Sequence, residues 1–228
     1  MNVESISPGL VVSRVLEIYR AHFGLLVGVA AVLFAIQFLV YLLLSASASI
    51  SLAVLFVALS VLYQGMVVKL VQDVQDGRRN HSAGDLLRSV EPVFWRLLAV
   101  SLLAGVGVAV GFVLLIIPGL VLLVIWAVVA PVTVLERPGV FAAFGRSRDL
   151  VRGNGWNVFG VLVVVFLAVI VISFIAGFAA DSLGSVGRSL VQWVVNAAVA
   201  PLTALSASVL YFALQAQQSP AAAPADTT

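Results

Sequence analysis

Six arginines close to the ends of long apolar segments are the residues of this chain best suited to chemistry, and that chemistry is the binding of phosphate. They are Arg14, Arg20, Arg88, Arg146, Arg148 and Arg152. A guanidinium group binds phosphate oxygens through paired hydrogen bonds, and each basic side chain near an anionic lipid surface contributes about 1 kcal/mol of attraction. The alternative is that these arginines only orient the chain, because basic loops stay on the cytoplasmic side of a membrane.

Each group of arginines lies on a segment with the spacing of an amphipathic helix that leads directly into an apolar run. In the first segment Val15 and Tyr19 share one face, whereas Arg14 points away from it. Two later segments, within 82–94 and 139–152, repeat the arrangement. An aromatic residue stands at each entry to the apolar run, where a membrane interface favours aromatic rings. We therefore expect three interfacial amphipathic helices on the cytoplasmic side.

Two of these segments carry signals for the start of a helix. Ser7 followed by Pro8 predicts an N-cap and a first helical residue. Ser82 with Asp85 three residues later is close to a capping box.

The apolar runs have the length and composition of membrane-spanning helices. The chain is 62% hydrophobic and its mean hydropathy is +1.17. A helix needs roughly 20 apolar residues to cross a hydrocarbon core about 30 Å thick. Runs without Asp, Glu, Lys or Arg cover 23–68, 97–135, 153–180 and 189–225. The first two suit two crossings each and the last two suit one each, which predicts six spans at about 24–44, 50–71, 97–117, 119–135, 157–179 and 190–214.

The fourth span has a second interpretation. Between Gly119 and Leu135 it offers about 17 residues, the lower limit for a crossing. Spans three and four can therefore form a re-entrant hairpin instead of two full crossings. The charge pattern separates the two arrangements only weakly, because the tip of that hairpin carries no charge.

The basic residues predict the orientation. With six spans and a cytoplasmic N-terminus, all the Lys and Arg residues except Arg188 lie on the cytoplasmic side. The bias of Lys and Arg in loops sets orientation, so we expect both termini inside a bacterial cytoplasmic membrane. The segment 215–228 is rich in Ala, Pro and Gln, and we expect it to be a disordered cytoplasmic tail.

The chain repeats itself with a period near 70 residues. Each unit contains one amphipathic segment, and the units cover about 7–71, 82–135 and 139–214. A helix breaker recurs in the last part of each unit, at Gly65, Pro131 and Pro201, and the motif around Pro131 matches that around Pro201. Such spacing indicates three parallel repeats in a single membrane domain, residues 1–214. Inverted repeats, which indicate alternating-access transport better, are not predicted.

Composition excludes several kinds of site. The chain has no cysteine and two histidines, so we expect no metal site, no cofactor and no disulfide. The span interiors hold no Asp, Glu, Lys, Arg or His, which disfavours a proton-coupled pump or an intramembrane hydrolase. Membrane lipids, anionic ones above all, are the expected partners, together with a membrane or cytoplasmic protein, and nucleic acid is not expected.

Small and polar residues within the spans predict helix packing. Gly107 and Gly111 fall on one face of the third span, which suits close approach of another helix. Gln64, Gln192 and Asn196 are polar, and the default role of such residues is hydrogen bonding between helices.

One stretch of the sequence resembles a known family. It resembles the membrane domain of bacterial glycerophosphoryl diester phosphodiesterases, whose stand-alone versions are widespread in actinobacteria. The resemblance rests on Ala130-Pro131-Val132-Thr133-Val134-Leu135-Glu136-Arg137, Arg146-Ser147, Leu150-Val151-Arg152-Gly153-Asn154, Trp156 and Val158-Phe159-Gly160. It implies a helical membrane fold but no phosphodiesterase activity, because the fused members carry their catalytic groups on a separate soluble barrel.

These patterns predict an all-α membrane protein that is not an enzyme. The favoured function is a non-catalytic membrane module that organises lipid or a partner protein. The alternatives are a transporter or permease for a neutral or lipidic substrate, and a subunit that needs a partner for catalysis.

Overall fold

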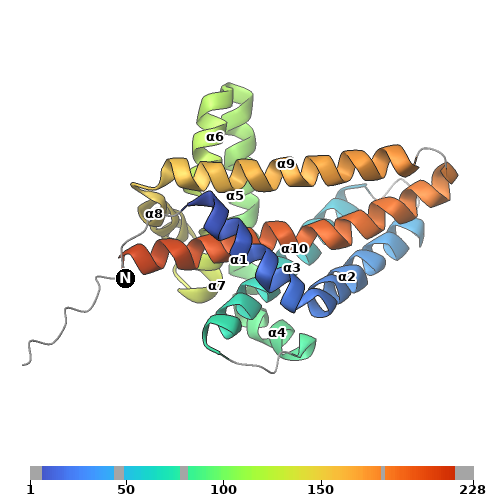
Figure 1. Cartoon of the computed structure of the whole chain (residues 1–228), viewed down its shortest axis with the longest axis horizontal. Coiled ribbons are helices and arrows are strands. Elements are labelled where there is room, and N and C mark those ends of the chain that lie inside the picture. The colour runs from blue at the N-terminus through green and yellow to red at the C-terminus, as the bar shows by residue number, and fades with distance from the viewer. Residues whose placement is uncertain (1–6, 44–48, 78–81, 181–182, 219–228) are drawn as a thin grey trace, which may run out of the picture.

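The computed structural model describes residues 7–43, 49–77, 82–180 and 183–218, and within these ranges the chain is helical apart from short turns (Figure 1). The all-α class predicted from the sequence is confirmed. The helices are α1 (Pro8–Ala21), α2 (Phe23–Leu43), α3 (Ser49–Gln75), α4 (Ala83–Val90), η2 (Glu91–Val93, a 3-10 turn), α5 (Phe94–Leu114), α6 (Ile116–Ile125), α7 (Val129–Leu135), α8 (Val140–Val151), α9 (Gly155–Ala180) and α10 (Gly184–Gln218).

Length and hydropathy make this a multi-pass membrane protein. Within the described residues, five segments are long and apolar enough to cross a membrane: Val54–Gln75, Ala83–Leu114, Ile116–Leu135, Gly155–Ala180 and Leu190–Gln218. A sixth is present if α1 and α2, which meet at a bend of 80°, are taken as one broken span. The six spans predicted from the sequence agree with the upper count.

The predicted helix starts are confirmed. The Ser7 side chain accepts a hydrogen bond of 3.3 Å from the Leu10 backbone N–H, and Pro8 is the first residue of α1. The Ser82 side chain accepts one of 3.3 Å from the Gly84 backbone N–H at the start of α4. In each case the hydroxyl satisfies a backbone donor that the first helical turn leaves without an intrahelical partner.

The core lies between α3, α7 and α10, each of which is the last helix of a predicted repeat unit. α3, α7 and α10 contact one another. In the apolar stretch of α10, 56% of the residues are buried, against 44% for α3, 39% for α6 with α7, 17% for the segment containing α5 and 11% for α9. α5 and α9 therefore leave the largest shares of their apolar residues outside the protein core, as helices that face lipid do.

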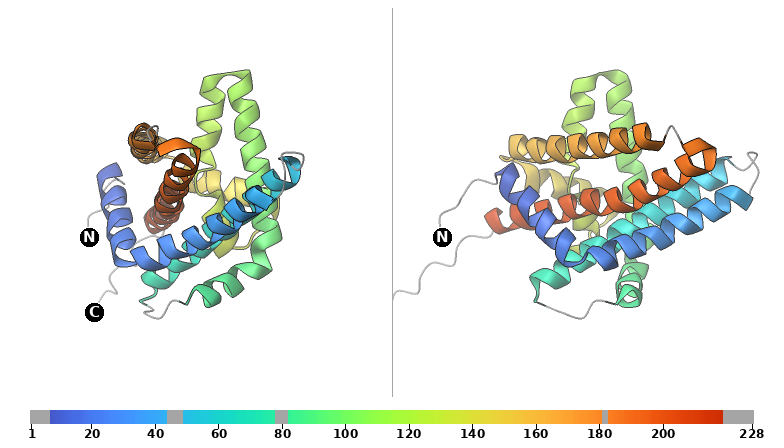
Figure 2. Two further views of the ribbon diagram at one scale, coloured as in Figure 1. Left: turned by 90° about the vertical axis from the view of Figure 1, so that its right-hand side faces the viewer. Right: turned by 45° about the vertical axis from the view of Figure 1, so that its right-hand side comes forward.

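Glycines hold α5 and α6 together in a tight hairpin, as the small residues of the third span predicted. A Cβ at Gly111 would lie 2.9 Å from the Gly119 Cα, and a Cβ at Gly107 would lie 2.5 Å from the Trp126 ring. The hairpin stands across the direction of α9 and α10 (Figures 1 and 2). Both predicted arrangements of spans three and four contain this hairpin, so the choice between a full crossing and a re-entrant loop stays a prediction.

The helix breakers behave differently from one another. α3 runs through Gly65 without interruption, which corrects the break predicted there. α10 also continues through Pro201. The fourth span does break, but at a turn over 126–128, and Pro131 is the third residue of α7. Pro at that position costs little, because the backbone N–H groups of a first helical turn have no intrahelical partner in any case.

The predicted tail begins later than expected. α10 continues to Gln218, so residues 215–218 are helical. The rest of the predicted tail lies outside the described residues, as do Arg78 and Arg79 in the loop after α3.

Candidate functional site

The amphipathic helix α1 forms a side-chain hydrogen bond to the backbone of α10 close to Pro201. Pro201 has no N–H, so the Ala197 carbonyl four residues earlier lacks its helical donor. The Tyr19 hydroxyl donates a hydrogen bond of 3.1 Å to the neighbouring Ala198 carbonyl. Burial raises the pKa of Tyr19 above its ordinary value, which keeps this phenol a hydrogen-bond donor.

A second amphipathic helix, α8, supplies a hydrogen-bond donor to the break between α6 and α7. The Val129 backbone N–H bonds to the Trp126 carbonyl, which leaves the Ile125 carbonyl without the partner that a continuous helix would give it. The Ser147 hydroxyl of α8 donates a hydrogen bond of 2.8 Å to that carbonyl. Ser147 is buried, so its hydroxyl makes this bond in place of a bond to water.

The third amphipathic helix, α4, packs where α3 carries its glycine. A Cβ at Gly65 would lie 2.7 Å from Val90 Cγ1 and 3.1 Å from Leu97 Cδ2. Gly65 is therefore a point of close approach. It admits α4 and the start of α5 against α3, and Val90 is fully buried there.

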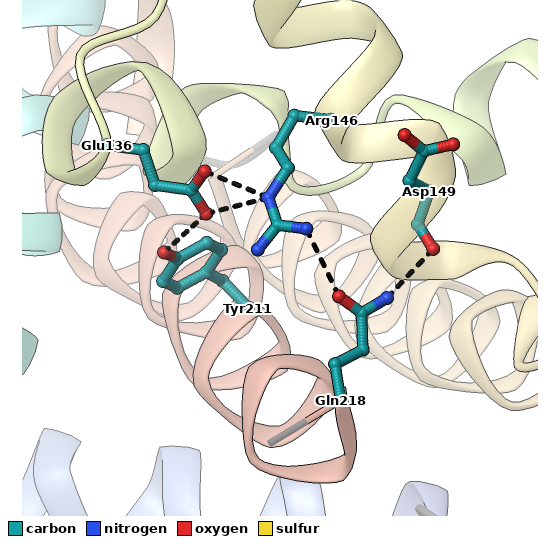
Figure 3. A network of polar contacts seen from close by, with 5 residues as sticks. All are labelled: Glu136, Arg146, Asp149, Tyr211 and Gln218. Atoms are coloured by element: carbon teal, nitrogen blue, oxygen red, sulfur yellow. Dashed lines mark hydrogen bonds and ion pairs between the residues drawn. The ribbon is translucent and has the colours of Figure 1, made fainter. Parts of the chain in front are cut away.

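A polar network ties the end of α10 to α8 (Figure 3). The Glu136 carboxylate accepts hydrogen bonds from Arg146 Nε at 2.9 and 3.1 Å and from the Tyr211 hydroxyl at 2.9 Å. Arg146 Nη1 donates to Gln218 Oε1 at 3.2 Å, and Gln218 Nε2 donates to the Asp149 carbonyl at 2.9 Å. Arg146 thus acts within the protein, where its guanidinium orients a carboxylate and the last residue of α10.

The six candidate arginines do not form one cluster. They lie on α1, on α4 and on or just after α8, which occupy separate places around the molecule (Figure 2). Arg14 forms an ion pair of 2.7 Å with Glu17 on its own helix. The exposed side chains among the six are those of Arg20, Arg88, Arg148 and Arg152.

An apolar groove of about 500 Å³ lies between α6 and the start of α9. Its walls include Leu120, Val124 and Phe159, and at one end it reaches Gly153 and Trp156. Trp156 is 85% exposed, so this end opens to the surface at the turn between α8 and α9.

The bend between α8 and α9 shapes that opening. Gly153 has a φ of +87°, a conformation that side chains other than glycine rarely adopt. The Asn154 backbone N–H bonds to the Val151 carbonyl at 2.9 Å, and its side-chain amide donates to Gln217 Oε1 at 2.9 Å. These bonds fix the turn that joins the exposed Arg152 to Gly153, which lines the groove.

The comparisons add no relative. Matching the chain against models of protein families, curated proteins and solved structures finds nothing. Among the described residues, no group of three or more His, Asp or Glu residues is placed to hold a metal ion. The candidate site therefore consists of the groove, the exposed arginines and the three amphipathic helices α1, α4 and α8.

The sequence did not mark the hydroxyl groups of Tyr19, Ser147 or Tyr211 as hydrogen-bond donors between helices. All three act through hydroxyl groups on backbone or carboxylate acceptors distant in the chain, and no local pattern marks such pairs. Glu136 carries a signal in hindsight, because it is the acidic residue at the end of the fourth span, next to a cluster of arginines.

Proposed function

We propose that this protein is a non-catalytic membrane module that organises lipid, and that it binds an anionic phospholipid in the groove between α6 and α9. The observation that carries the proposal is an apolar groove that reaches Gly153, the residue directly after the exposed Arg152. Arg148 lies one helical turn earlier and is also exposed. An acyl chain fills the groove, and the headgroup phosphate lies against the two guanidinium groups.

The chemistry of the groove suits this ligand. Its walls are almost wholly apolar, so they take up hydrocarbon and offer nothing to a polar solute. Trp156 at the opening is the kind of residue that lies at the level of lipid headgroups. Two arginines contribute about 1 kcal/mol each near an anionic surface, enough to favour an anionic over a zwitterionic headgroup roughly tenfold or more.

The proposal also includes how the helices are arranged in the membrane. α1, α4 and α8 are the interfacial helices of three parallel repeats, and each packs on the last span of the preceding unit. α4 packs on α3, α8 on α7 and α1 on α10, which closes the series into a ring. The arginines then face the cytoplasm at a bacterial cytoplasmic membrane, with both termini on that side. Kinship with the membrane domain of glycerophosphoryl diester phosphodiesterases, without their catalysis, remains part of this proposal.

Lipid retention tests the function. The purified protein is placed in nanodiscs containing equal amounts of phosphatidylglycerol and phosphatidylcholine, and the lipids that stay bound on release into detergent are counted by native mass spectrometry. We expect retained phosphatidylglycerol, reduced several-fold in an Arg148→Gln, Arg152→Gln double variant. An Arg20→Gln, Arg88→Gln double variant removes the same charge elsewhere and keeps the lipid. Equal retention by the two double variants contradicts the proposal.

A further inference from the structure

A second cavity lies between α2, α3 and α10, near the middle of all three helices. Its volume is about 430 Å³. Phe34, Phe56 and Ala204 supply part of its apolar wall, and Ser60, Gln64 and Thr203 contribute polar side chains. This mixture differs from the α6–α9 groove, and it places hydrogen-bonding groups at a depth where the spans are otherwise apolar.

Part of the lining of the cavity is exposed. Ser60 and Thr203 are exposed, as is Phe56 at 45%, although they belong to the central parts of helices that span the membrane. A polar side chain exposed to hydrocarbon without a partner is unfavourable. Any ligand that relieves this cost arrives through the lipid, so it is itself soluble in the membrane.

The cavity also selects against charge. No Asp, Glu, Lys, Arg or His is present among its described lining residues. An ionic headgroup drawn to this depth would have no counter-charge and would lose its hydration. The ligand is therefore uncharged.

Thr203 adds a further requirement. Its hydroxyl donates its one hydrogen to the Ala200 carbonyl at 2.9 Å, so toward the cavity the oxygen can only accept. The Gln64 amide both donates and accepts, and among the described residues the structure gives it no hydrogen-bond partner. A ligand that satisfies both side chains must carry a hydroxyl or N–H group of its own.

We propose that the cavity between α2, α3 and α10 binds an uncharged lipid alcohol, of the diacylglycerol type, whose hydroxyl group is held by Thr203 and Gln64. The acyl chains leave through the opening beside Phe56 and Ser60. This site is independent of the phospholipid groove and involves none of its arginines.

Photolabelling tests the proposal on the full chain in phosphatidylcholine nanodiscs. The probe is a diacylglycerol with a diazirine in one acyl chain, and its 3-O-methyl ether is the matched probe without a hydroxyl donor. Labelled peptides are identified by mass spectrometry. We expect labelling of α3 and α10 by the alcohol, and about fivefold less by the ether, the change that one lost hydrogen bond produces.

Two near-isosteric variants complete the test. Thr203→Val removes the acceptor and should lower labelling by the alcohol about fivefold. Thr133→Val makes the same change in the matching motif of α7, where the hydroxyl donates to the Val129 carbonyl away from the cavity, and should leave labelling unchanged. Equal labelling by alcohol and ether, or equal labelling of the two variants, overturns the proposal. So does a dimer cross-linked through α3 and α10 that excludes the probe. The Arg148→Gln, Arg152→Gln double variant leaves the diacylglycerol site unchanged. Failure of the phospholipid proposal can therefore be distinguished from failure of the diacylglycerol proposal.

Discussion

The Tyr211 hydroxyl donates a hydrogen bond of 2.9 Å to Glu136, a residue 75 positions earlier in the chain. The same carboxylate accepts two bonds from Arg146 Nε, so it joins α10, α8 and the end of α7 at one point. The sequence suggested Arg146 as a contact for lipid headgroups, but in the structure Arg146 holds helices together. The network also fixes the C-terminal end of α10.

Tyr211→Phe should destabilise the protein by about 1–2 kcal/mol. The ring of Tyr211 is buried and stays in place, but Glu136 loses a hydrogen bond to a charged acceptor. The change is measured as a lower midpoint of thermal unfolding in detergent. In an Arg146→Gln background the effect of Tyr211→Phe should differ, because the two donors share one carboxylate. Strictly additive effects would contradict a shared network.

Gly65→Ala should destabilise the packing of α4 on α3. The new Cβ would lie 2.7 Å from Val90 Cγ1, and α4 must move to admit it. We expect a cost of about 1–3 kcal/mol in unfolding free energy. A Val90→Ala substitution in the same chain should recover part of the loss, because it removes the atoms that clash.

Gly105→Ala is the matched control for that substitution. A Cβ at Gly105 has no neighbour within 4 Å, so alanine there gains helix propensity without a clash. Its unfolding midpoint should equal or exceed that of the parent protein. If both glycine variants lose stability equally, close packing at Gly65 is not the cause.

Ser147→Ala should cost about 1–3 kcal/mol, because the Ile125 carbonyl at the break between α6 and α7 loses its donor. Ser89→Ala is the comparison, since the Ser89 hydroxyl donates to the Leu86 carbonyl of its own helix. The unfolding midpoint of the Ser89 variant should change much less. The reverse order would show that α8 does not support the break.

Leu115→Cys decides between a crossing and a re-entrant hairpin. The native chain has no cysteine, and Leu115 at the tip of the hairpin is 69% exposed. With six full spans, a membrane-impermeant maleimide added outside intact spheroplasts labels this cysteine. Labelling only after the membrane is opened identifies the re-entrant arrangement.

Much of the fold is contained in local patterns of the sequence. Apolar runs predicted the spans, and serines before α1 and α4 predicted their starts, because span length and N-cap chemistry depend on neighbouring residues only. Gly107 and Gly111 predicted a close helix contact for the same reason: small residues on one face permit it whatever the partner.

Whether a Gly or Pro breaks its helix depends on the residues that pack against it. The sequence alone therefore predicted the helix breaks less well than the spans. Gly65 looked like Pro131 and Pro201 by position, yet it admits Val90 and leaves α3 intact. Gln192 and Asn196 were expected to bond between helices, but Gln192 Nε2 donates to Asn196 Oδ1 within α10 at 3.1 Å. The cavity beside Thr203 was missed, since three separate helices build it.

The contact between Tyr19 and Ala198 joins residues 179 positions apart, and it sets an order of events during biosynthesis. At about 5–20 residues per second, α1 leaves the ribosome roughly 10 to 40 s before the part of α10 that receives it. Until then its apolar face, with Val11, Val15 and Ile18, lacks the cover that α10 gives it. An amphipathic helix can wait on the lipid surface. The first helix made is thus among the last to dock, and a chain cut short before α10 keeps an unburied α1 that quality-control proteases can recognise.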